Sequence, residues 1–154
     1  MSRPTIEFKE IPFEAGHAED LIGQAKLNEA EKKFLLDRHL YSIAADGHGV
    51  SFVANGHLLG AGGIIPIWDG LGEAWVLPGN LIHRHRKTFV RLVRDGIDRM
   101  NAEHQFRRIQ ATARADAASA QRFLEFLGFE REGCLRAYGP DGADHFLFAK
   151  MTGG

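Results

Sequence analysis

Five consecutive residues, His83 to Lys87, form the part of the sequence whose side chains most clearly suggest chemistry. They stand between an apolar run, Ala74 to Leu77, that predicts a strand and a run, Lys87 to Asn101, that predicts a helix. The first N–H groups of a helix have no partners inside the helix, and the helix dipole adds partial positive charge there. The basic run therefore predicts an anion site and suggests a ligand that carries phosphate.

Glycine is missing from this predicted site. Loops that bring their backbone against phosphate usually contain glycine, because it has no side chain in the way. No glycine occurs in the sequence between Gly79 and Gly96. His83 and His85 have a spacing that can chelate a metal, but no cysteine or acidic residue nearby completes a set of ligands. We therefore expect no metal.

The composition limits the class of protein. A chain of 154 residues suits one domain with a substantial core, and 44% hydrophobic with 25% charged residues is ordinary for a soluble globular protein. The net charge of -1 argues against a basic nucleic-acid-binding protein. The single cysteine, Cys134, allows no intrachain disulfide and suits a reducing compartment. No apolar run would span a membrane and the charged N-terminus does not suit a signal peptide, so we expect a cytoplasmic protein.

Hydrophobic periodicity predicts that the first forty residues form a strand, Thr5 to Phe8, and two helices. The second helix is expected to open with a capping box at Asn28 and Glu31 and to bury Phe34 and Leu35.

The middle of the chain predicts an antiparallel meander, because apolar runs are separated by the turn-forming pairs Asp46-Gly47, Asn55-Gly56 and Asp69-Gly70. Next comes a helical apolar stripe that begins at Phe89, followed by a strand at residues 108–113. A helix that ends at Gly128 and two strands, at 130–138 and 145–151, complete the chain. The order β-α-α-β-β-β-α-β-α-β-β predicts an α/β (α+β) fold, with one domain and a mixed sheet flanked by helices.

This order resembles the GNAT family of N-acetyltransferases over nearly the whole chain. The most specific local match is the segment Ala120 to Phe129, which is similar to the family's Asn-x-x-Ala-x-x-Phe/Leu-Tyr-x-x-x-Gly-Phe segment. Ala120 and Phe123 are expected to pack this helix on the sheet, and Gly128 to end it. The resemblance implies a single GNAT-like domain over residues 1–154, with a mostly antiparallel sheet.

The resemblance also implies acetyl-CoA, or another acyl-CoA, as cosubstrate. In the family, the backbone of the fourth strand pairs with the pantetheine arm, and Trp75, Val76 and Leu77 match that strand. A backbone N–H near Val76 or Leu77 would polarise the thioester carbonyl.

A loop of the pattern Arg/Gln-x-x-Gly-x-Gly/Ala binds the pyrophosphate in the family, and the matching register here is Arg84 to Phe89. Lys87 and Phe89 stand at the glycine positions, so side chains are expected where phosphate would need bare backbone. The implied phosphate-binding residues are instead Arg84, Arg86, Lys87 and Thr88, with charge-assisted bonds from the basic side chains.

Two residues are candidates for the proton transfers. The family often has a Glu as general base on the fourth strand, a position that Glu73 could fill, although Glu73 could also merely flank a turn. Leu124 replaces the family's usual Tyr general acid. Tyr138 could take over that role, or it could be structural. Both roles require a perturbed pKa.

Two functions remain open. In its glycine-poor loop and the segment that begins at Trp75, the chain resembles GNAT-like proteins of tailed bacteriophages. The first hypothesis is an N-acyltransferase that moves an acetyl group from CoA to the amine of an unknown small molecule or protein. The second is a non-catalytic GNAT-fold protein of phage assembly or host interaction, in the host cytoplasm or the virion. Either could be a homodimer, and neither a nucleic-acid partner nor a membrane is expected.

Overall fold

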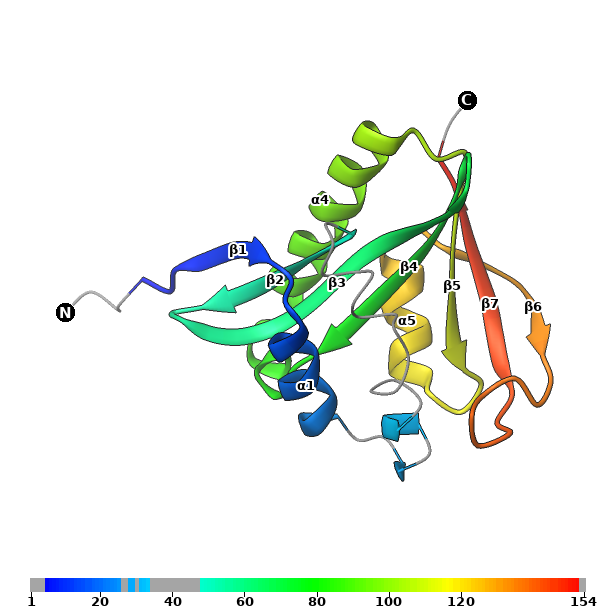
Figure 1. Cartoon of the computed structure of the whole chain (residues 1–154), viewed down its shortest axis with the longest axis horizontal. Helices are drawn as coiled ribbons and strands as arrows, with labels where there is room; N and C mark the ends of the chain where they lie inside the picture. The colour runs from blue at the N-terminus through cyan, green and yellow to red at the C-terminus, as the bar shows by residue number, and fades with distance from the viewer. Residues whose placement is uncertain (1–4, 26–27, 30, 34–47, 153–154) are drawn as a thin grey trace.

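The computed structural model describes residues 5–25, 28–29, 31–33 and 48–152. Within them, seven strands form one sheet in the spatial order β1-β2-β3-β4-β5-β7-β6 (Figure 1). The strands are β1 (Phe8–Pro12), β2 (Gly49–Ala54), β3 (His57–Trp68), β4 (Leu71–Pro78), β5 (Arg108–Arg114), β6 (Glu130–Leu135) and β7 (His145–Met151). Neighbouring strands are antiparallel, except β4 and β5, which are parallel. The predicted α+β fold, with a mixed and mostly antiparallel sheet, is confirmed.

The turns of the meander follow the predicted chemistry. Asn55 and Gly56 both have positive φ, 49° and 79°, as a type I′ hairpin turn requires. Gly70, with φ of 88°, lies in the turn from β3 to β4. The third predicted turn, Asp46-Gly47, lies outside the described residues. The first strand, predicted at Thr5 to Phe8, lies instead at Phe8–Pro12, because its pairing with β2 starts opposite Ala54, where β2 ends.

Helices cover both faces of the sheet. α1 (Ala15–Gln24) packs on one face, and α4 (Arg86–His104) and α5 (Ala118–Phe126) pack on the other (Figure 1). The buried residues of α4 recur at spacings of three and four, as predicted for a helix with one apolar stripe: Phe89, Val93, Gly96 and Ile97. A short 3₁₀-helix, η2 (Asn80–Arg84), links β4 to α4.

The end of α5 is a Schellman motif. Gly128 has φ of 94°, its N–H donates to the Glu125 carbonyl, and the Phe129 N–H donates to the Leu124 carbonyl. Phe129 and Leu124 are both buried in the core between the sheet and α4. Gly128 therefore ends the helix as predicted, and the chain turns at once into β6.

Asn28 makes one of the two contacts of the predicted capping box. Its Oδ1 accepts a hydrogen bond from the Glu31 N–H at 2.8 Å, but Glu31 Oε1 accepts from the Asn28 side-chain Nδ2, at 2.8 Å, and not from its backbone N–H. Residues 31–33 are helical. Phe34 and Leu35, predicted for the inner face of this helix, lie outside the described residues.

Among the described residues, no helix combines the length and the apolarity that a membrane crossing requires.

Candidate functional site

The parallel strands β4 and β5 pair over only a short stretch. Leu71 lies opposite Arg108, Gly72 opposite Ile109, and Glu73 opposite Gln110. Beyond Glu73, β4 continues to Pro78 and β5 to Arg114, with no pairing between them in the described part of the chain. Figure 1 shows the two strands moving apart toward this end of the sheet. The sheet is therefore split at its centre, with Glu73 and Gln110 at the apex of the opening.

The split leaves peptide groups of β4 available. The carbonyl oxygens of Trp75 and Leu77 are directed at β3, since each lies 3.1 Å from where a Cβ on Gly62 or Gly60 would stand. Peptide groups alternate in direction along a strand. The N–H and C=O groups of Ala74 and Val76 are therefore directed into the opening between β4 and β5, where a ligand can pair with them.

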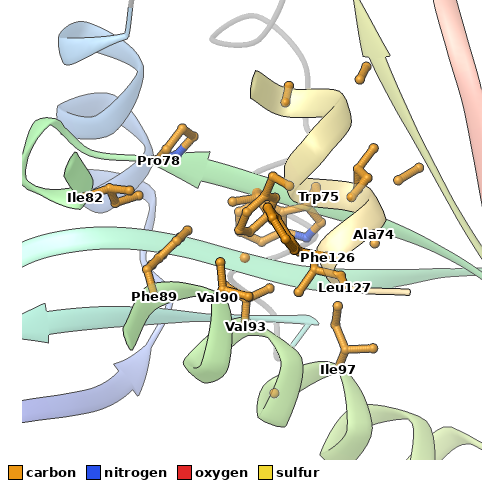
Figure 2. A pocket seen from close by; sticks show the side chains of 18 of the residues that line it. Ala74, Trp75, Pro78, Ile82, Phe89, Val90, Val93, Ile97, Phe126 and Leu127 are labelled. Atoms are coloured by element: carbon orange, nitrogen blue, oxygen red, sulfur yellow. The ribbon is translucent and has the colours of Figure 1, made fainter. Parts of the chain in front are cut away.

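A cavity of about 960 Å³ lies in this opening. Its walls come from α1, β2, β3, β4, η2, α4, β5 and α5, and Figure 2 shows side chains converging between α4 and α5. Pro78 and Ile82 stand at one end and Ile97 at the other (Figure 2). Most of the labelled side chains are apolar. A cavity of this size and character is typical of a small-molecule or cofactor site.

The predicted basic run lies at one end of the cavity, but its residues do not act together. Arg86 is the first residue of α4, and Arg86 and His83 line the cavity. The His83 Nδ1 is 2.5 Å from the Asn80 carbonyl oxygen, and the His85 ring packs edge-on against Phe8 at 5.4 Å. Arg84, Lys87 and Thr88 are absent from the lining, and Arg84 and Lys87 are exposed beside it.

The first turn of α4 remains open to an anion. No side chain within the described residues caps it, and its N-cap residue is His85. The backbone N–H groups of Arg86, Lys87 and Thr88 therefore retain their hydrogen-bonding capacity at the positive end of the helix dipole. An anionic group could be bound there by backbone N–H groups and by the Arg86 guanidinium together.

The position of Phe89 differs from the expectation that its side chain would stand in the way of phosphate. The side chain is 2% exposed, and it packs edge-on to Phe52 at 6.0 Å and stacked on Phe123 at 5.7 Å. Gly60 makes this possible, because a Cβ there would lie 2.8 Å from the Phe89 ring. Of the two glycine replacements, only Lys87 therefore adds a side chain on the exposed side of the helix start.

Glu73 is half-buried, and this burial raises its pKa. Alternation along β4 places it on the same face as Trp75 and Leu77, which pack with α1. Ala74 and Val76, on the other face, pack with α4 and line the cavity. Glu73 therefore stands at the apex of the opening, on the face opposite α4.

Trp75 lines the cavity, whereas Leu77 does not. The Trp75 ring packs edge-on to Phe13 at 4.8 Å, and its indole Nε1–H is buried with no hydrogen-bond partner among the described residues. Such a donor is free to bind a ligand acceptor.

The two predicted catalytic residues lie apart. Tyr138 follows β6, its residue is 53% exposed, and its ring packs against His145 at 5.2 Å. His145 pairs with Arg114, four residues along β5 from Gln110, which is the neighbour of Glu73. That separation is about 13 Å along the strand.

The sequence did not predict the ionic cluster around Arg114. Its Nη1 lies 3.0 Å from Glu31 Oε1 and 2.9 Å from Asp141 Oδ2, and its Nε lies 3.0 Å from Asp116 Oδ1. Hydrogen bonds from Arg114 lower the pKa of Asp116 and lower that of Asp141 to about 2. These residues come from three parts of the chain, and no local spacing connects Glu31 and Asp141 to the Arg114–Asp116 pair.

Nowhere in the described part of the chain do three or more His, Cys, Asp or Glu side chains gather where they could hold a metal ion.

Solved structures share this architecture. An acetyltransferase of the GNAT family from Streptococcus pneumoniae is similar over 97% of this chain and 100% of its own, with 17% identity and a TM-score of 0.67. RimL, a ribosomal-protein alpha-N-acetyltransferase solved in complex with coenzyme A, is similar over 94% of this chain and 93% of its own, with 10% identity and a TM-score of 0.70. A spermidine N-acetyltransferase SpeG variant from Vibrio cholerae is similar over 94% and 93%, with 16% identity and a TM-score of 0.65.

No family model and no curated protein matches the sequence. At these low identities the likeness concerns the fold alone. The chain has the fold of the GNAT-family acetyltransferases.

Proposed function

We propose that the protein is an acyl-CoA-dependent N-acyltransferase. The observation that carries this proposal is the opening between β4 and β5, which contains a cavity that reaches the uncapped N-terminus of α4. One end of the cavity offers positive charge, the middle offers unpaired backbone of β4, and the apex offers a carboxylate. CoA has phosphates, an amide-containing arm and a thioester in the same order.

The phosphates would bind at the start of α4. Its first N–H groups and the Arg86 guanidinium supply charge-assisted hydrogen bonds without glycine in the loop. The burial of Phe89 supports this assignment, because its side chain leaves the helix N-terminus clear.

The thioester would lie in the middle of the opening. An amide N–H of the pantetheine arm would donate to the Val76 carbonyl oxygen, and the Val76 N–H, on the side nearer the apex, would donate to the thioester carbonyl oxygen. A fixed donor at that oxygen stabilises the negative charge that develops when a nucleophile attacks the carbonyl carbon. Leu77 is less suited to this role, since its carbonyl is directed at β3.

The acceptor amine would approach from the face of the sheet opposite α4, where Glu73 stands. Its nitrogen forms a bond to the carbonyl carbon, the C–S bond breaks, and Glu73 takes the proton from the nitrogen directly or through a water. CoA leaves as the thiolate and is protonated by solvent. Burial raises the pKa of Glu73 and makes it a stronger base for this transfer. Tyr138 has no place in this step, because it lies along β5 from the apex.

Calorimetric titration with CoA and acetyl-CoA tests the proposal. We expect binding that Arg86→Ala weakens and makes less sensitive to salt, since the lost contact is between charges. Arg91→Ala is the matched control, because Arg91 is exposed on the same helix and does not line the cavity. If neither compound binds at millimolar concentration, the proposal is wrong, and a non-catalytic role for this fold becomes the better hypothesis.

A further inference from the structure

The cavity extends beyond the length that an acetyl group needs. Its lining includes Arg86 at the proposed phosphate end, Val76 on β4, and residues of α4 as far as Met100. From Val90 to Met100, both of which line the cavity, the helix rises about 15 Å. An acetyl group has one methyl beyond its carbonyl carbon. Most of this far part of the cavity would therefore stay unfilled in an acetyl-CoA complex.

Small side chains line part of the cavity. Ala74 on β4, with Ala111 and Ala113 on β5, forms part of the sheet side, and Gly96 forms part of the α4 side. Gly96 is buried, yet a Cβ there would have its nearest neighbours at 3.8 Å and 4.0 Å. These are ordinary contacts, with Arg99 of the same helix and Phe52 of β2, so a methyl group fits at this position without displacing a neighbour.

Larger apolar side chains complete the far end. Ile97 and Met100 come from α4, and Leu127 and Phe129 follow α5. Figure 2 shows Ile97 and Leu127 lying away from Pro78 and Ile82, on the same side of the cavity as Ala74. Apolar walls favour a saturated hydrocarbon chain, because its burial removes apolar surface from water and requires no hydrogen-bonding partner.

We propose that the protein transfers acyl chains longer than acetyl, with the chain bound between α4 and the split of the sheet. This inference rests on the proposed function and names its donor class, a medium-chain acyl-CoA. The bonds that form and break are those of the acetyl reaction, and only the chain on the carbonyl carbon differs. The thioester keeps its place at Val76, and the chain extends past Ala74 toward Met100.

A chain-length series tests this inference on the unaltered protein. CoA, acetyl-CoA, butyryl-CoA, hexanoyl-CoA and octanoyl-CoA are titrated by calorimetry. Each buried methylene should raise the affinity about fourfold until the cavity is full. If octanoyl-CoA and hexanoyl-CoA bind no better than acetyl-CoA, the inference is overturned while the proposed function stands. If none of the five compounds binds, both are overturned.

Two substitutions of one residue locate the chain. Gly96→Leu places a branched side chain in the far part of the cavity, whereas Gly96→Ala adds only the Cβ that the structure accommodates. We expect Gly96→Leu to lower the ratio of octanoyl-CoA to acetyl-CoA affinity by on the order of tenfold, and Gly96→Ala to lower it much less. An unchanged ratio in Gly96→Leu would show that the chain lies elsewhere. If Gly96→Leu does not fold, the chain-length series still decides.

Discussion

Glu73 is the residue on which the proposed chemistry depends, and two features of its position make it suitable. It is the last residue of β4 to pair with β5, so its backbone is fixed at the apex of the opening. Its carboxylate is half-buried, which raises its pKa. The same burial makes the charged form unfavourable in the folded protein, so catalysis and stability place opposite demands on this residue.

Glu73→Gln should lower the rate of amine acylation by about 100-fold or more, because the base is lost. It should also raise the Tm at neutral pH. Since the folded-state pKa lies above the ordinary value of 4.5, wild type loses stability as the pH rises from 4.5 through the raised pKa, and the variant does not. Steady-state rates and thermal melts from pH 4 to pH 8 check both effects, and the wild-type kcat/KM should rise with pH through the same pKa.

Glu103→Gln is the matched control, since Glu103 is an exposed carboxylate on α4. A lower Tm with little change in rate would show that Glu73 has a structural role instead.

For single residues, the sequence predicted which side chains could take part in the site better than it predicted where those side chains lie. Phe89 matches a glycine position in the phosphate loop of the family that the sequence resembles, yet it is also the first residue of the apolar stripe of α4, and the stripe determines where its side chain lies. Nothing in the local pattern decides between these two readings. The deciding contact is Gly60, which lies on another strand.

The packing of α4 on β3 controls how open the site is. Phe89 is the first buried residue of α4, and its ring lies over Gly60 of β3. The close approach seats the start of α4 on β3, next to the part of the cavity that Arg86 lines.

Gly60→Ala should destabilise the protein by about 1–3 kcal/mol, because its Cβ would lie 2.8 Å from the Phe89 ring and 3.1 Å from the Leu77 carbonyl oxygen. Urea unfolding measures the loss. In a Phe89→Leu background the penalty should be smaller, with a coupling of about 0.5–3 kcal/mol. Gly133→Ala, which meets nothing within 4 Å, should change stability little. Equal losses in both backgrounds would show that the two residues do not compete for space.

The elements themselves were largely predictable, but the arrangement that makes the site was not. Asn55 and Gly56 specify their hairpin locally, and Gly128 specifies a helix end. The parallel pairing of β4 with β5 depends instead on residues far apart in sequence. A Cβ on Gly72 would meet the side chains of Ile64 and Phe106, so close packing across the start of β5 helps to set how the two strands meet.

At the scale of the whole molecule, the Arg114 cluster connects parts of the chain that share no strand pairing. Arg114 at the end of β5 contacts Glu31, near the N-terminus, and Asp141, between β6 and β7. Asn28 donates a hydrogen bond to the same Asp141 carboxylate at 2.8 Å. The cluster therefore fixes the segment after α1 to the far half of the sheet.

Arg114→Met should lower the Tm at neutral pH, and the difference from wild type should shrink as the pH falls from 3.8 toward 2. The pKa of Asp141 is lowered from 3.8 to about 2, so its contribution is present above 3.8 and is lost as the pH falls through about 2. Thermal melts across this range provide the measurement. Arg136→Met, at an exposed residue beside β6, is the control. A difference in Tm that is constant with pH would argue that the cluster contributes by packing alone.

The short pairing of β4 with β5 divides the sheet into two halves, each formed by one continuous part of the sequence. β1 to β4 come from the first 78 residues and β5 to β7 from residue 108 onward, so each half of the sheet is built from neighbouring sequence. Three residue pairs and the connection through α4 hold the halves together in the sheet. A molecule bound in the opening would contact both halves of the sheet at once and would stabilise their arrangement for as long as it is bound. Ligand binding at the site and the stability of the sheet are then coupled, and a search for ligands can monitor either of them.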